Sequence, residues 1–143
     1  MVKPAVLFTM AVILCGNVSL CIAEMDHQAH GMSMNMNSDG MVMNTNHHEL
    51  PWGCESISED YEFSVRAGRD YAKDNPGMVF GMNQHEYNVA PCSRITVTFS
   101  NEDEVRHQWM VHGLPGYLYP TGMFHLEAMA GKSVTGTFIV PED

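Results

Sequence analysis

The stretch Arg94-Ile95-Thr96-Val97-Thr98-Phe99 decides the fold class of this chain. Apolar and polar residues alternate along it, and a period of two is typical of a strand with one face in a core. An acidic turn follows at 101–104, and a second alternating run occupies 105–111. The stretch therefore predicts two successive strands joined by a turn, the beginning of a β-sheet domain.

Further short strands are predicted on both sides of this pair. They cover 61–65, 86–89 and 132–140, and turns rich in Gly, Pro and Asn separate them. Residues 113–129 contain many Gly, Pro and Tyr and are predicted to form a long loop. No segment has the period of an amphipathic helix. We expect an all-β domain over 51–143, a Greek-key β-sandwich.

Residues 1–23 are predicted to be a secretory signal peptide. Lys3 supplies the positive charge, a mostly apolar run follows, and Cys21-Ile22-Ala23 places small residues at a cleavage site. The run is too short and wrongly flanked to anchor the chain in a membrane, and no later segment could span one. We therefore expect an exported, periplasmic protein without a membrane span.

Residues 24–50 have a composition that predicts a disordered, metal-binding tail. The segment has no aromatic residue before Leu50 and a single β-branched aliphatic, so it offers little apolar surface for a core. Thioethers match Cu(I) or Ag(I), and imidazoles also suit Cu(II). The predicted ligands are Met25, His27, His30, Met32, Met34, Met36, Met41, Met43, His47 and His48. The alternative is a low-complexity linker in which methionine is common but binds no metal.

Two cysteines remain once the signal peptide is removed. Cys54 and Cys92 form an even pair in an oxidising compartment, which favours a disulfide. The rival interpretation is that one of them is a copper thiolate, although neither lies in a cluster of Cys and His. The net charge of −10 argues against nucleic acid as a partner and is compatible with cationic partners or metal ions.

His107 is the strongest single metal-ligand candidate. In an alternating strand it shares a face with Val105, Trp109 and Val111, where a histidine is ordinarily a core residue hydrogen-bonded to backbone. The order of residues from Phe99 and Asn101 to Val105-Arg106-His107 resembles the cupredoxin strand that supplies the first histidine of a type 1 copper site. The segments 92–99 and 131–138 are similar to the strands that flank this site. The resemblance extends over about 56–143 and is closest to exported bacterial copper-tolerance cupredoxins, some of which have a Met/His-rich leader.

This resemblance implies a copper centre with two imidazoles, one thiolate and a distant thioether. In cupredoxins the thiolate, the second histidine and the methionine follow a strand like 137–140. Nothing follows Asp143 here, so the resemblance transfers His107 alone. We expect the sandwich to lack its final strand or strands, either because the chain is a fragment of a longer one or because it is a truncated form.

The other histidines have weaker claims as ligands. His112 lies on the opposite strand face from His107 and is either a surface residue or an auxiliary copper ligand. His125 lies in the predicted long loop two residues after Met123. It is either a residue that simply packs in this loop or one that makes a transient contact with a soft metal ion. His85 has no partner in the sequence and is predicted to be a surface residue.

The leading functional hypothesis is an exported cupredoxin-type protein that serves copper tolerance or handling and transfers electrons to a redox partner. The alternative is a redox-inert Cu(I) or Ag(I) scavenger or metallochaperone that acts through the Met/His-rich tail. We do not expect an enzyme. The His-x-His pairs of a multicopper oxidase, a nucleophile elbow and a His-Glu-x-x-His motif are all missing from the sequence.

Overall fold

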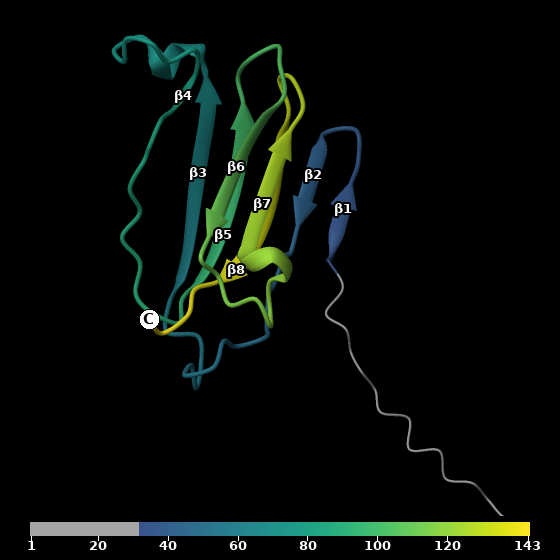
Figure 1. Cartoon of the computed structure of the whole chain (residues 1–143), viewed down its shortest axis with the longest axis vertical. Helices are drawn as coiled ribbons and strands as arrows, with labels where there is room; N and C mark the ends of the chain where they lie inside the picture. The colour runs from purple at the N-terminus through teal and green to yellow at the C-terminus, as the bar shows by residue number, and fades with distance from the viewer. Residues whose placement is uncertain (1–31) are drawn as a thin grey trace, which may run out of the picture.

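The computed structural model of the chain describes residues 32–143, which fold into two four-stranded β-sheets (Figure 1). The first sheet has the order β1-β2-β7-β6, formed by Met34–Met36, Gly40–Met43, Met123–Ala128 and His107–His112. The second has the order β4-β3-β5-β8, formed by Gly81–Met82, Asp60–Gly68, Arg94–Asn101 and Ser133–Ile139. Within the described residues the helices are two 3-10 turns, Arg69–Ala72 and Pro120–Gly122, and no helix there is long and apolar enough to span a membrane. The predicted all-β class is confirmed.

Strand β5 follows the alternation of its sequence. Its apolar side chains at 95, 97 and 99 are almost completely buried. On the other face, threonine hydroxyls meet across the pairing with β8 at 3.0 Å, Thr96 with Thr137 and Thr98 with Thr135. Strand β5 runs parallel to β3 and antiparallel to β8, so it forms the middle of the second sheet.

The hydrophobic core lies between the two sheets. Phe124 and Leu126 of β7 enter it from the first sheet, and Val97 enters it from the second. The sheets approach each other closely at Gly136 of β8. A Cβ atom there would lie 2.7 Å from Phe124 Cζ and 2.8 Å from Val42 Cγ1, so a side chain at this position would force the layers apart.

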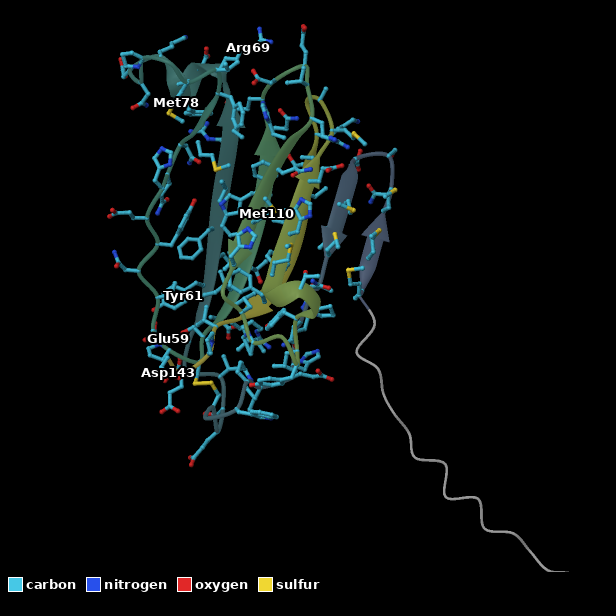
Figure 2. All side chains as sticks on the ribbon, in the orientation of Figure 1. Glu59, Tyr61, Arg69, Met78, Met110 and Asp143 are labelled. Carbon is cyan, nitrogen blue, oxygen red and sulfur yellow. A yellow bond between two sulfur atoms is a disulfide. The ribbon has the colours of Figure 1, made fainter. Side chains whose placement is uncertain are left out.

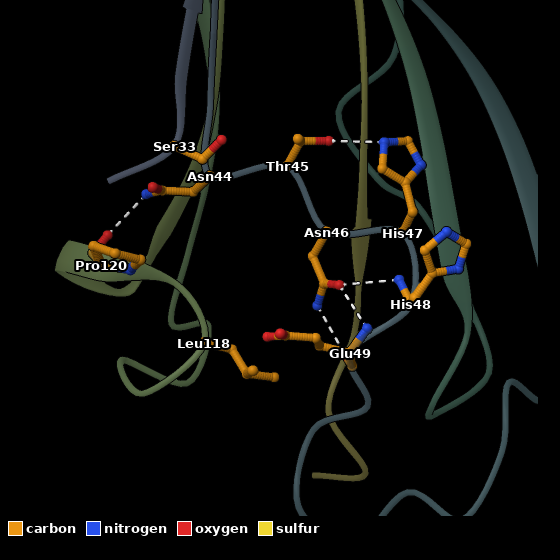
Figure 3. A pocket seen from close by; sticks show the side chains of 9 residues that line it. All are labelled: Ser33, Asn44, Thr45, Asn46, His47, His48, Glu49, Leu118 and Pro120. Carbon is orange, nitrogen blue, oxygen red and sulfur yellow. Dashed lines mark hydrogen bonds between the residues drawn. The ribbon is translucent and has the colours of Figure 1, made fainter. Parts of the chain in front are cut away.

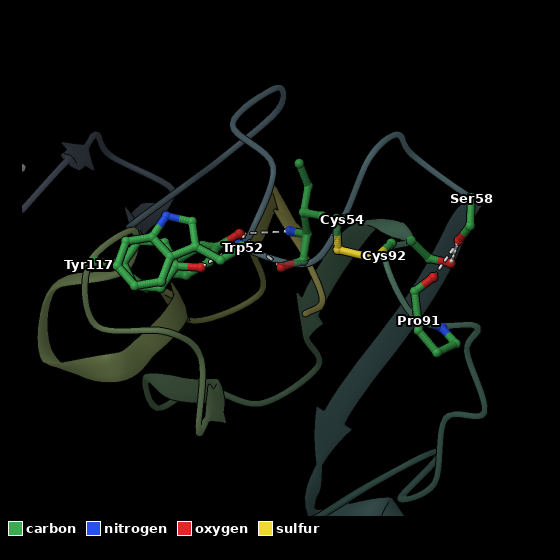
Figure 4. Close-up of a disulfide and its surroundings, with 9 residues drawn as sticks. Trp52, Cys54, Ser58, Pro91, Cys92 and Tyr117 are labelled. Carbon is green, nitrogen blue, oxygen red and sulfur yellow. Dashed lines mark hydrogen bonds between the residues drawn. A yellow bond between two sulfur atoms is a disulfide. The ribbon is translucent and has the colours of Figure 1, made fainter. Parts of the chain in front are cut away.

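A disulfide joins Cys54 to Cys92, whose Cα atoms are 5.6 Å apart (Figure 4). It links the segment before β3 to the loop before β5, and neither sulfur is therefore available as a copper thiolate. Nearby along the chain, the Trp52 ring stacks on the Tyr117 ring with centroids 4.0 Å apart, and the Trp52 backbone N–H donates to the Tyr117 hydroxyl. These contacts tie the start of the predicted 51–143 domain to the 113–122 loop.

The prediction that residues 24–50 are disordered is wrong for residues 32–50. Strands β1 and β2 form a hairpin, and β2 adds to the edge of β7. After the hairpin, the Asn46 N–H donates to the Thr137 carbonyl, which attaches the chain to β8. The segment has few apolar side chains, but backbone hydrogen bonds to a sheet edge and the inward side chain of Val42 hold it in place. The folded domain therefore begins before residue 51.

The predicted long loop at 113–129 is also wrong in its second half, because 123–128 forms β7, an inner strand of the first sheet. Residues 124–128 do alternate between apolar and polar, and the loop prediction rests on the Gly, Pro and Tyr residues at 113–122. The predicted strand at 86–89 is not observed; Tyr87 and Val89 pack against the core from a loop, and β4 lies earlier. Val105 is 51% exposed and precedes β6, so it does not share the buried face of His107.

The predicted signal peptide at 1–23 and the candidate ligands Met25, His27 and His30 lie outside the described residues.

Candidate metal centre

His107 lies at the start of β6 and is 5% exposed, so its predicted place beside the core is confirmed. Its Nε2 atom is 2.7 Å from Asp103 Oδ2, and the Phe80 ring covers the imidazole with centroids 4.5 Å apart. The hydrogen bond with His107 holds the pKa of Asp103 below its ordinary value, and the Arg69 N–H adds to the effect. In this structure His107 is thus the partner of a carboxylate.

No group of three or more His, Cys, Asp or Glu side chains within residues 32–143 is placed to hold a metal ion. The structure therefore brings no such set of donors around His107. Another soft donor, the methionine thioether, is abundant in this sequence.

The His107–Asp103 pair predicts an acid-sensitive contribution to stability. Because the folded-state pKa of Asp103 lies below its unfolded value, the contribution is present above the unfolded pKa near 3.8 and is lost as the pH falls. We expect Asp103→Asn to remove about 1 kcal/mol of stability at pH 6 and to flatten the loss of stability between about pH 4 and pH 2. Urea unfolding at a series of pH values measures this, with Glu104→Gln as the control on the same turn. An unchanged acid profile in Asp103→Asn would contradict the role of the pair.

The outer face of the first sheet carries a concentration of methionine and histidine. Val42, Phe124 and Leu126 point into the core, so the residues that alternate with them point to the opposite side. The same alternation applies to β6, where Trp109 and Val111 are the inward residues. The soft donors on this face are Met34 and Met36 of β1, Met41 and Met43 of β2, Met123 and His125 of β7, and Met110 and His112 of β6.

The strand register aligns several of these donors in a row across all four strands. Met34 pairs with Met43, Met43 pairs with His125, and His125 pairs with Met110. Side chains at directly paired positions share a face, with Cβ atoms about 4.5–5.5 Å apart. Three thioethers and one imidazole are therefore neighbours along a single line. Met110, midway along β6 (Figure 2), is 42% exposed and borders an open pocket of about 450 Å³, which makes its sulfur accessible.

His125 has an unusual environment for a residue on an outer sheet face. It is only 8% exposed, and its buried Nε2 atom has no hydrogen-bond partner. Burial holds the pKa of His125 below its ordinary value; the Glu127 carboxylate opposes this effect and His112 reinforces it. A neutral imidazole with an unpartnered ring nitrogen is the form in which histidine binds a metal.

The acidic residue next to this row, Glu127, already has polar partners. Glu127 is 6% exposed, its Oε2 accepts a hydrogen bond from Gln108 at 2.6 Å, and its Oε1 lies 3.4 Å from Arg106 Nη1. The carboxylate is therefore compensated by its own neighbours, and the donors that remain on the face are neutral sulfur and nitrogen atoms.

The tail histidines His47 and His48 lie elsewhere, beside an open pocket of about 290 Å³ (Figure 3). Both side chains are exposed and their ring centroids are 5.9 Å apart, and His47 Nε2 is 3.4 Å from the Thr45 hydroxyl. The structure does not bring them to the methionine row. Met32 is 54% exposed and precedes β1, whereas His85 is exposed in the loop after β4.

Met110 is not among the ligands predicted from the sequence, and Met123 and His125 belong to the predicted loop at 113–129. The signal that could have identified them is a short repeated pattern, Met110-Val111-His112 and Met123-Phe124-His125. In each, a core residue separates a thioether from an imidazole, which is the spacing that places both donors on one side of a strand.

Comparison with models of protein families, with curated proteins and with solved structures finds no match to this chain.

Proposed function

We propose that this protein is an exported copper-handling protein that binds Cu(I), and chemically similar Ag(I), on the outer face of its first sheet. The observation that carries the proposal is the register that gathers methionines from all four strands beside a buried, unpartnered imidazole. The protein then acts as a redox-inert scavenger or metallochaperone.

The choice of metal follows from the donor atoms. Thioethers are soft, neutral ligands that select Cu(I) over harder cations such as Mg²⁺ or Ca²⁺, and imidazole is acceptable to copper in both oxidation states. Because β1 and β2 form a hairpin rather than a free tail, several thioethers lie near one another before the metal binds. Less conformational entropy is therefore lost on binding. This preorganisation supports tighter binding than the same methionines would give in a disordered segment.

Electron transfer through a type 1 centre is the alternative that the cupredoxin resemblance implies. It requires His107 to exchange its contact with Asp103 for a copper ion and requires a thiolate, whereas Cys54 and Cys92 form a disulfide. Absorbance separates the two functions, because a thiolate-bound Cu(II) ion gives an intense visible band and a thioether–imidazole Cu(I) site is colourless.

We expect a variant with Met34, Met36, Met41 and Met43 replaced by leucine to bind fewer equivalents of Cu(I) than the native chain. Leucine and methionine are similar in volume and the four side chains lie on a solvent-facing surface, so the free energy of unfolding should change by less than about 1.5 kcal/mol. Anaerobic competition titration against a chromophoric Cu(I) chelator measures the stoichiometry and affinity of the full chain.

The matched control for this titration is Met78→Leu, because Met78 is 52% exposed and lies outside the face. No detectable Cu(I) binding by the native chain would contradict the proposed function, and so would an intense visible band on addition of Cu(II).

A further inference from the structure

We propose that the centre that anchors the metal is formed by the two Met-x-His sequences of β6 and β7, with Met110, His112, Met123 and His125 as a ligand set for one Cu(I) or Ag(I) ion. This inference rests on the proposed function and assigns it to a specific site. It differs from a methionine-rich tail as the binding element, because none of the four residues belongs to the segment 24–50.

The antiparallel register brings the two sequences into opposition. Met110 pairs with His125, and His112 pairs with Met123, so each thioether faces an imidazole on the neighbouring strand. Opposed residues on one sheet face have Cβ atoms about 4.5–5.5 Å apart, and diagonal ones about 7–8 Å or less. The side chains of methionine and histidine extend far enough to close these gaps onto a common ion.

The core packing holds this arrangement in place. Val111 and Phe124, the middle residues of the two sequences, both belong to the hydrophobic core, and Phe124 is completely buried. A shift of one strand by a single residue would turn Phe124 to solvent and the donors inward, which the loss of core burial opposes. The ligand positions are therefore set by the same contacts that stabilise the fold.

The four side chains differ in access. His125 is buried with an unpartnered Nε2 atom, whereas His112 and Met110 are exposed and Met123 is half-buried. An ion can thus approach from solvent through the exposed pair and be held against the buried imidazole. Methionine is flexible enough to move aside and close over the ion without displacing the backbone.

The ligand set favours a monovalent soft ion. All four donors are neutral, and the nearest carboxylate, Glu127, is compensated by Arg106 and Gln108. Two sulfur and two nitrogen donors suit four-coordinate Cu(I) and Ag(I), which have no preference for a square-planar arrangement of ligands. On the other side of His125, Met43 extends the row toward the exposed hairpin and offers a path for an ion to enter or leave.

The test uses the full chain, with Cu(I) competition titration for affinity and Ag(I) as a diamagnetic probe for NMR. We expect Met110→Leu and His125→Gln each to weaken the affinity for the most tightly bound Cu(I) ion. The loss should be at least roughly 10–100-fold, as is typical when a group that supports a metal site is removed. Met78→Leu and His85→Gln, at exposed positions outside the face, should leave this affinity unchanged. Ag(I) should shift the ring resonances of His112 and His125 and leave those of His47 and His48 in place at one equivalent.

The inference is overturned if Met110→Leu and His125→Gln still bind one Cu(I) ion tightly, whereas replacement of the four hairpin methionines abolishes this tight binding. In that case soft-metal binding stands and its anchor lies in the hairpin. If the native chain takes up no Cu(I), the proposed function fails first. Met110→Leu keeps the test decisive even if His125→Gln proves unstable, since Met110 is on the surface and leucine preserves its volume.

Discussion

Replacement of Cys54 and Cys92 by alanine is expected to lower the free energy of unfolding by about 4 kcal/mol. The disulfide closes a loop with a sequence separation of 38 residues, and the chain-entropy relation gives about this value for a loop of that length. The loop holds β3 next to β5, a parallel pair whose register brings Tyr61 opposite Ile95. Without the cross-link, the unfolded chain gains the freedom that this pairing has to overcome.

Urea unfolding of the native and Cys54→Ala/Cys92→Ala proteins measures the difference, and thermal unfolding should show a fall in Tm of roughly 15 °C. The reduced native protein is the matched control, since it has the same broken cross-link with both cysteines in place. A loss below about 1 kcal/mol would mean that the β3–β5 pairing does not depend on the disulfide.

Gly40→Ala is expected to detach the β1–β2 hairpin from the sheet. Gly40 has φ 154°, a conformation that L side chains rarely adopt, and a Cβ atom there would overlap the Glu127 carbonyl oxygen. Overpacking costs about 1–3 kcal/mol and an unfavourable backbone conformation a similar amount, so we expect a loss of about 2–5 kcal/mol in this region. Because β2 lies between β1 and β7, separation at Gly40 also removes Met34 and Met43 from His125.

Hydrogen exchange of the backbone amides of Met41 and Met43 reports this detachment directly, and their protection should fall while that of β5 is retained. Gly116→Ala is the control, because a Cβ atom there meets nothing within 4 Å. The same variant separates the two metal hypotheses: a hairpin-anchored site would be lost, whereas the β6–β7 centre would still hold one ion. Unchanged amide protection in Gly40→Ala would show that the hairpin tolerates the shift.

The strands that could be predicted are those in which alternation is strong and uninterrupted. Strands β5 and β8 were identified from their sequences because Ile95, Val97, Phe99 and Phe138 mark one face without polar breaks. Strand β7 also alternates over 124–128, but this run is short and directly follows the Gly-, Pro- and Tyr-rich residues 113–122, which predict a loop. The hairpin was missed for a different reason, since its pairing depends on a partner strand more than 80 residues away along the chain.

The candidate site, like the strands, could be predicted from the sequence only in part. The abundance of methionine and histidine in the sequence predicts soft-metal ligands, because donor chemistry belongs to the residue type. The composition predicts these ligands in the N-terminal segment, where methionine is most frequent, and does not single out Met110. It also selected His107, which the structure pairs with Asp103.

Alternation and residue type are local properties, so the all-β class and the burial of β5 can be inferred from the chain without coordinates, and soft-metal binding can be predicted from it. The distances between Met43, His125 and Met110 depend on strand register, which is set only when β2, β6 and β7 pack together over one core. Tertiary structure therefore decided which thioether faces which imidazole, because register is a relation between strands far apart in the sequence.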